Sequence, residues 1–101
     1  VMAIRDACKN LDSFQLDGCE IYTSCEPCPM CLGAIYWARP ERVYYAADRM
    51  DAAKAGFDDS FIYEELDLPA MERKIVAEQH DRAIAEEVFQ QWIHLENKID
   101  Y

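Results

Sequence analysis

The sequence predicts an α/β domain, because a stretch of about 30 residues reads as a strand, a helix and a second strand. Residues 19–24 (CEIYTS) and 42–47 (RVYYAA) have the composition of short strands. Residues 27–39 (PCPMCLGAIYWAR) read as a helix that Pro40 ends. Because a crossover of this kind joins neighbouring parallel strands, we expect a parallel pair with a right-handed connection.

The start of the predicted helix is also the point of interest. Pro27 and Pro29 are tolerated there because the first amides of a helix have no acceptor within it. Cys28 is therefore expected in the first turn, where the carboxyl end of a strand passes into a helix. Open α/β sheets bind their ligands at such places.

Composition narrows the class of protein. The 101 residues allow one small domain, and the net charge is −10 with dispersed basic residues, which argues against a nucleic-acid partner and favours a small-molecule substrate. The acidity has an equally good explanation in solubility alone. Five unevenly spaced cysteines favour a reducing cytoplasm over a disulfide framework. No apolar run is long enough to predict a membrane span.

The first residues already follow a helical repeat. Val1, Ile4, Cys8 and Leu11 fall on one helical face, and no capping residue precedes them. We therefore expect Val1 to lie inside a helix and the chain to be the C-terminal part of a longer protein.

Cys28 and Cys31 are the candidate metal ligands. Residues three apart on a helix have Cβ atoms about 5–6 Å apart, so both thiolates can reach one zinc ion with bonds of about 2.3 Å. A helix N-terminus also stabilises the thiolate forms that a metal needs.

Other interpretations of the cysteines stay open. CPMC fits the CxxC pattern of thiol-disulfide oxidoreductases, and Cys25 with its two neighbours resembles an incomplete ferredoxin run. A structural zinc would need two more ligands, for which the chain offers only His80 and His94. We interpret Cys8, Cys19 and Cys25 as buried and inert.

A family resemblance favours the zinc interpretation. Residues 27–31 (PCPMC) match the second half of the H-x-E…P-C-x-x-C signature of zinc nucleobase deaminases. Residues 23–47 as a whole resemble the cytidine-deaminase-like superfamily. Residues 51–66 (DAAKAGFDDSFIYEEL) and the end at Tyr101 resemble its guanine deaminase branch. The likeness covers nearly the whole chain and is loosest at 72–88.

The resemblance implies a fold and an activity. The fold is a three-layer α/β/α arrangement with a mixed central sheet, whose N-terminal part is missing from this chain. The activity is zinc-dependent hydrolytic deamination of guanine to xanthine and ammonia in purine metabolism. The zinc would be held by Cys28, Cys31 and a His upstream of Val1, and the general acid/base Glu would also lie upstream. The residues present would then bind zinc incompletely.

The resemblance also implies three pocket residues. Asp59 would bind the purine or assist proton transfer, although the spacing alone favours a solvated Asp58-Asp59 pair. Trp37 would form a wall of the purine site, and is as readily interpreted as a core residue. Tyr101 would close the pocket. We interpret Tyr63 as a packing residue.

The whole chain, residues 1–101, is expected to be part of one domain with a helical C-terminal segment at 81–101. Ile84, Val88, Trp92, Leu95 and Ile99 recur at helical spacing there, after an acidic linker at 66–80. By resemblance this segment is exchanged in a homodimer, and the alternative is that it completes its own core.

Two alternatives to guanine deamination remain at this stage. One is deamination of adenosine in tRNA, within the same superfamily. The other is thiol-disulfide exchange by CxxC, which metal analysis would distinguish from a zinc enzyme.

Overall fold

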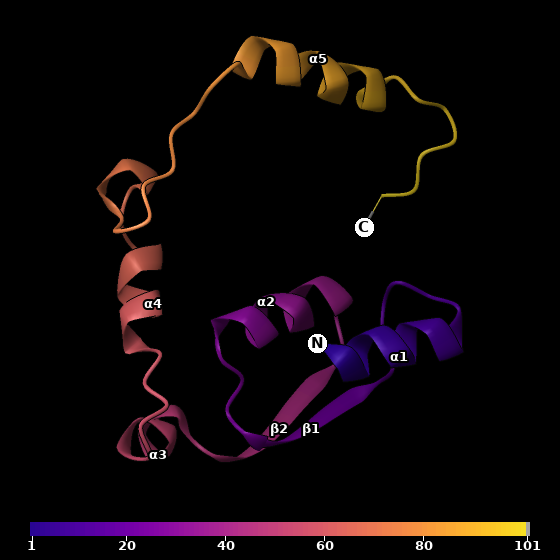
Figure 1. Ribbon diagram of the computed structural model, residues 1–101. Coiled ribbons are helices and arrows are strands. Elements are labelled where there is room, and N and C mark those ends of the chain that lie inside the picture. The colour runs from indigo at the N-terminus through magenta and orange to yellow at the C-terminus, as the bar shows by residue number, and fades with distance from the viewer. Residues whose placement is uncertain (101) are drawn as a thin grey trace. The chain divides into compact units, whose positions relative to one another are not determined.

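The computed structural model describes residues 1–100, and Figure 1 shows the order of their elements along the chain. The elements are α1 (Met2–Leu11), β1 (Glu20–Cys25), α2 (Pro29–Ala38), β2 (Arg42–Ala47), α3 (Arg49–Lys54), α4 (Ser60–Leu66), a 3₁₀ turn (Ala70–Glu72) and α5 (Arg82–Ile93). The chain divides into two units, residues 1–67 and residues 68 onward. None of the helices described is long and apolar enough to cross a membrane.

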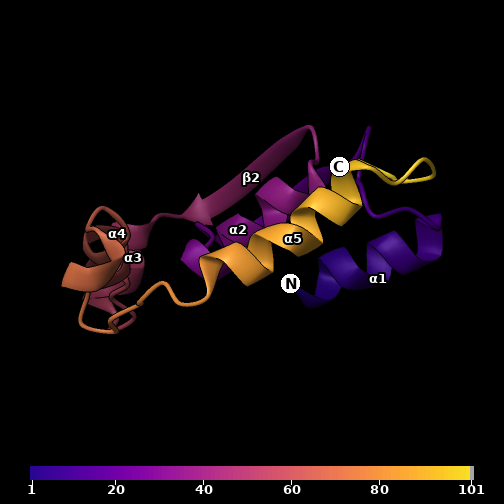
Figure 2. The same ribbon diagram turned by 90° about the horizontal axis from the view of Figure 1, so that it is seen from above.

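The first unit contains the predicted crossover. β1 and β2 pair in parallel, with Tyr22 opposite Tyr44 and Cys25 opposite Ala47. α1 and α2 lie on the same side of this sheet, as Figures 1 and 2 together show. The α/β class is thus confirmed. Among residues 1–100 the sheet consists of these two parallel strands. The mixed central sheet that the resemblance implies is therefore not seen within these residues.

The small core of the first unit lies where α2 meets the loop after α1. Leu16, Ile35 and Ala38 are buried, and the Leu16 amide donates a hydrogen bond of 2.7 Å to the Ala38 carbonyl. α2 ends at Ala38, and its C-cap Arg39 adopts the left-handed conformation at φ 54°. The core therefore holds the far end of α2, which lies one residue before the predicted last residue, Arg39.

α2 begins two residues later than predicted, at residue 29 instead of 27. Pro29 is the first helical residue, and Cys28 is the N-cap with an extended backbone at φ −66° and ψ 167°. The prediction that Cys28 lies within the first turn is wrong, because the helical conformation is disfavoured for a residue before proline. Cys31 does lie in the first turn, so the two thiols still flank the helix N-terminus.

Two short helices after β2 were not predicted. α3 begins with a reciprocal capping box: the Asp51 amide donates to the Asp48 carboxylate at 2.9 Å, and the Asp48 amide donates to the Asp51 carboxylate at 3.2 Å. α4 follows from Ser60. These helices are too short to produce a clear apolar repeat, which explains why periodicity did not find them.

The second unit contains α5, which is shorter than expected. The helix ends at Ile93, so the prediction of a helix through residues 81–101 is wrong from residue 94 to residue 100. His94 Nδ1 lies 2.6 Å from the Gln90 carbonyl oxygen, and Lys98 Nζ donates to the Ile93 carbonyl at 3.0 Å. These side chains satisfy carbonyls of the last turn, and Leu95 and Ile99 lie beyond the end of the helix.

Candidate functional site

The candidate site is built around the turn that connects β1 to α2. β1 ends at Cys25, and α2 begins at Pro29. Cys28 and Cys31 are both half-buried free thiols. Because Pro27 and Pro29 fix two backbone φ angles in this turn, the position of Cys28 is strongly constrained by the strand before it.

The pKa of the Cys28 thiol is lowered from its usual value. The main cause is the backbone amide of Cys31; the Cys31 side chain and the Met30 amide act in the same direction. The Cys31 amide favours the thiolate electrostatically, without meeting the geometry of a capping hydrogen bond. Partial burial and the negative charge of Asp59 oppose this shift in the Cys28 pKa. The local field thus favours the form of cysteine that binds metals.

A cavity of about 600 Å³ adjoins the cysteines. Cys25, Cys28 and Cys31 line one part of it, and Ile4 and Ala7 of α1 line another. Its volume is in the range of small-molecule sites. Trp37 and Asp59 are not among its lining residues.

Asp58 and Asp59 differ in environment. The Asp58 carboxylate is exposed and accepts a hydrogen bond of 2.9 Å from the Ser60 amide, which lowers the pKa of Asp58. Asp59 is half-buried, is the N-cap of α4 without a side-chain cap bond, and acts through its charge on the Cys28 thiol. Of the two carboxylates, Asp59 is therefore the one whose negative charge affects the pKa of Cys28.

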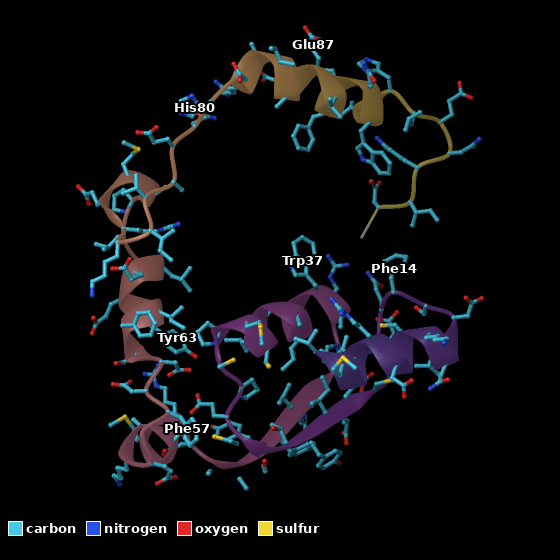
Figure 3. The ribbon with its side chains drawn as sticks, viewed as in Figure 1. Phe14, Trp37, Phe57, Tyr63, His80 and Glu87 are labelled. Atoms are coloured by element: carbon cyan, nitrogen blue, oxygen red, sulfur yellow. The ribbon has the colours of Figure 1, made fainter. Side chains whose placement is uncertain are left out.

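The two aromatic residues predicted for the pocket have different outcomes. Trp37 is 64% exposed and extends from α2 on the side away from the sheet, as Figure 3 shows. It is not a core residue in this chain, and its contact with a purine stays a prediction. Tyr101 lies outside the described residues.

The donor set fits part of a zinc site. Two thiols at a helix N-terminus suit zinc, which prefers sulfur and nitrogen ligands. No third Cys, His, Asp or Glu stands with them at metal-binding distance within residues 1–100. In the second unit, His80 Nε2 lies 3.1 Å from a carboxylate oxygen of Glu78, and His94 Nδ1 lies 2.6 Å from the Gln90 carbonyl oxygen.

Sequence reasoning missed Glu26 and Arg49. The Glu26 amide donates to the Ala47 carbonyl at 2.8 Å, and its carboxylate accepts from the Arg49 amide at 2.9 Å. The Arg49 guanidinium lies 4.8 Å from the centre of the Tyr63 ring, on α4. The capping residue Asp48 is the signal that would have located the start of α3 and hence the Arg49 amide.

Comparison with known proteins agrees with this geometry. Residues 1–47, which contain the cysteine turn, match the cytidine and deoxycytidylate deaminase zinc-binding region. The structure matches the X-ray structure of guanine deaminase from Bacillus subtilis with a TM-score of 0.92 and 61% identity, covering 98% of this chain and 63% of that one. Residues 1–47 thus carry the zinc-binding region of the cytidine and deoxycytidylate deaminases.

Two related proteins differ in their similarity to the chain. It is 60% identical to guanine deaminase of Bacillus subtilis over all 101 residues, and spans 65% of that protein's length. It is 31% identical to tRNA-specific adenosine deaminase of Aquifex aeolicus over 92 residues, covering 91% of this chain and 58% of that protein. The family's zinc-binding region implies zinc as the cofactor.

Proposed function

We propose that the complete protein catalyses the hydrolytic deamination of guanine to xanthine and ammonia. The observation that carries this proposal is the PCPMC turn at the N-terminus of α2, in a chain 60% identical throughout to a guanine deaminase. In the reaction, water replaces the amino group on C2 of guanine, and the amino group leaves as ammonia.

The residues of this chain contribute binding and positioning. Cys28 and Cys31 would hold zinc, and a His upstream of Val1 would be the third protein ligand. When bound, zinc supplies an activated water at neutral pH. The Glu that moves protons between water, ring and leaving group would also lie upstream.

Asp59 is proposed to bind the purine and to assist proton transfer to its amino group. Its partial burial and its electrostatic effect on Cys28 support a position near the reacting group. Trp37 is proposed as a wall of the purine site, and Tyr101 as the residue that closes it and excludes water.

The quaternary arrangement is a further part of the proposal. The protein would be a cytoplasmic homodimer in which residues 81–101 are exchanged, so that Tyr101 of one subunit closes the pocket of its partner. The exposed apolar side chains of α5 support this arrangement, since such residues normally pack against another surface.

Deamination of tRNA adenosine is the second candidate and has less support. The identity to a tRNA-specific adenosine deaminase is 31%, about half of that to the guanine deaminase. The net charge of −10 also opposes binding of an RNA backbone.

Substitution of the proposed ligands tests the function in the complete protein. Cys28→Ala and Cys31→Ala should each remove zinc and guanine turnover together, because a three-ligand site does not hold its ion with one ligand missing. Metal analysis and xanthine formation are the measurements.

Cys8→Ala and Cys19→Ala are the matched controls, because these thiols are also half-buried but lie outside the turn. They should retain both zinc and turnover. Stoichiometric zinc in Cys28→Ala would show that the ligand assignment is wrong, and a reversible Cys28–Cys31 disulfide without metal would favour the oxidoreductase alternative.

A further inference from the structure

Glu26 is attached to the opposite strand at two points. Its amide donates to Ala47 at 2.8 Å, which continues the pairing of β1 and β2 by one residue beyond the end of β1. Its carboxylate reaches further and accepts from the Arg49 amide at 2.9 Å, across 23 positions of sequence. Glu26 is itself half-buried.

The Arg49 amide needs such an acceptor. Arg49 is the first residue of α3, so its amide has no acceptor within that helix. The capping box occupies the Asp48 and Asp51 amides and leaves this one to Glu26. The carboxylate therefore satisfies a backbone donor that the helix does not satisfy.

The segment between Glu26 and Cys28 is stiff. Glu26 and Cys28 each precede a proline, which disfavours the helical conformation for both. Pro27 and Pro29 have fixed φ angles. Because the backbone between them has little freedom, holding Glu26 in place also restricts the position of the Cys28 thiol two residues later.

We propose that Glu26 is a positioning residue, whose carboxylate holds the Cys28 turn against the junction of β2 and α3 through the Arg49 amide. The inference rests on the proposed function for its consequence, because Cys28 is there a zinc ligand. It assigns Glu26 no contact with zinc or substrate. Its role is to keep one thiol where the metal needs it.

The first test compares Glu26→Ala with Glu26→Gln in the complete protein. Glutamine keeps an oxygen acceptor of the same reach and loses only the charge, whereas alanine loses the acceptor. Zinc affinity, measured by competition with a chromogenic chelator, should fall about 10-fold in Glu26→Ala. It should stay within about twofold of the original in Glu26→Gln.

The second test breaks the same hydrogen bond from the donor side. Arg49→Pro removes the amide hydrogen, and proline is well tolerated at the first position of a helix. Asp48 before it is already extended, at φ −88° and ψ 174°, which is the conformation favoured for a residue preceding proline. Arg49→Ala is the control, since it loses the same guanidinium and keeps the amide.

Arg49→Pro should lower zinc affinity about 10-fold, as Glu26→Ala does, and Arg49→Ala should not. The double variant Glu26→Ala/Arg49→Pro should lose no more affinity than either alone, because both remove one bond. Thermal unfolding without metal identifies any variant that fails to fold. If one pair of variants contains such a protein, the comparison within the other pair (Glu26→Ala with Glu26→Gln, or Arg49→Pro with Arg49→Ala) tests the inference.

Three results would overturn the inference. They are unchanged zinc affinity in Glu26→Ala, equal losses in Glu26→Gln and Glu26→Ala, and equal losses in Arg49→Ala and Arg49→Pro. Because the measurement is zinc binding, it is separate from the activity. A protein that binds zinc as described but leaves guanine intact would contradict the proposed function and leave this inference standing.

Discussion

Asp58 and Asp59 are adjacent in the sequence, yet their carboxylates act on different partners. Asp58 accepts a hydrogen bond from Ser60, while the charge of Asp59 acts on the Cys28 thiol. The sequence spacing alone favoured two solvated carboxylates, and it does not indicate that Asp58 and Asp59 have different environments. α4 begins directly after the pair, at Ser60 with Asp59 as its N-cap, and a helix without a clear repeat is not visible in the sequence.

Asp59→Asn should therefore change the titration of Cys28. The Asp59 charge raises the Cys28 pKa against the stronger effect of the Cys31 amide, so its removal should lower the Cys28 pKa further. The pH at which Cys28 of the metal-free complete protein becomes reactive to iodoacetamide should move down. Tandem mass spectrometry of the labelled peptide locates the reaction at Cys28.

Asp58→Asn is the matched control for this titration. Its carboxylate faces the Ser60 amide and is not among the groups that shift the Cys28 pKa, so the profile should stay where it is. An Asp59→Asn profile that does not move, or that moves to higher pH, would place Asp59 away from the cysteine turn.

At the scale of elements, prediction succeeded where backbone chemistry is local. β2 was predicted at residues 42–47 and lies at Arg42–Ala47, because its β-branched and aromatic residues stand between a proline and an aspartate. The end of α5 was predicted wrongly: the helix ends at Ile93, and the His94 and Lys98 side chains contact carbonyls of its last turn. An apolar repeat that continues through Leu95 and Ile99 carries no sign of those contacts.

The C-terminus of α2 provides a prediction about stability. Arg39 holds φ 54°, a conformation that costs a residue with a Cβ atom about 1–2 kcal/mol. Glycine avoids this cost but loses about 0.5–1 kcal/mol through its greater freedom in the unfolded chain. Arg39→Gly should thus raise the free energy of unfolding of the complete protein by about 0.5–1 kcal/mol.

Urea denaturation measures this change, with Arg39→Ala as the control. Alanine loses the same exposed side chain and keeps the Cβ atom, so it should give no such gain. Zinc content should be equal in both variants. If Arg39→Gly is no more stable than Arg39→Ala, the left-handed conformation does not set the end of α2.

At the scale of the whole molecule, the second unit lacks a core of its own. The buried residues of residues 1–100 are Leu16, Ile35 and Ala38, all in the first unit. In α5, Ile84 and Val88 are 68% and 64% exposed, and Trp92 is 44% exposed. A segment that buries so little apolar surface does not offset the entropy of ordering it, so we expect α5 to pack on another surface in the complete protein.

Removal of residues 97–101 tests whether that surface belongs to a partner subunit. Under the proposed exchange, the truncated protein keeps its zinc ligands but loses the residue that closes the neighbouring pocket. Guanine turnover should fall strongly, and zinc content should stay the same. Solution mass and metal analysis accompany the kinetic assay.

Mixing the truncated protein with full-length Cys28→Ala makes the test decisive. A mixed dimer would combine the intact zinc site of one subunit with the intact C-terminus of the other. Random exchange of equal amounts makes half of the dimers mixed, each with one complete pocket, so about a quarter of full activity should return. If the truncated protein is fully active alone, Tyr101 does not close a pocket. If it is inactive and mixing restores nothing, the C-terminus serves its own subunit.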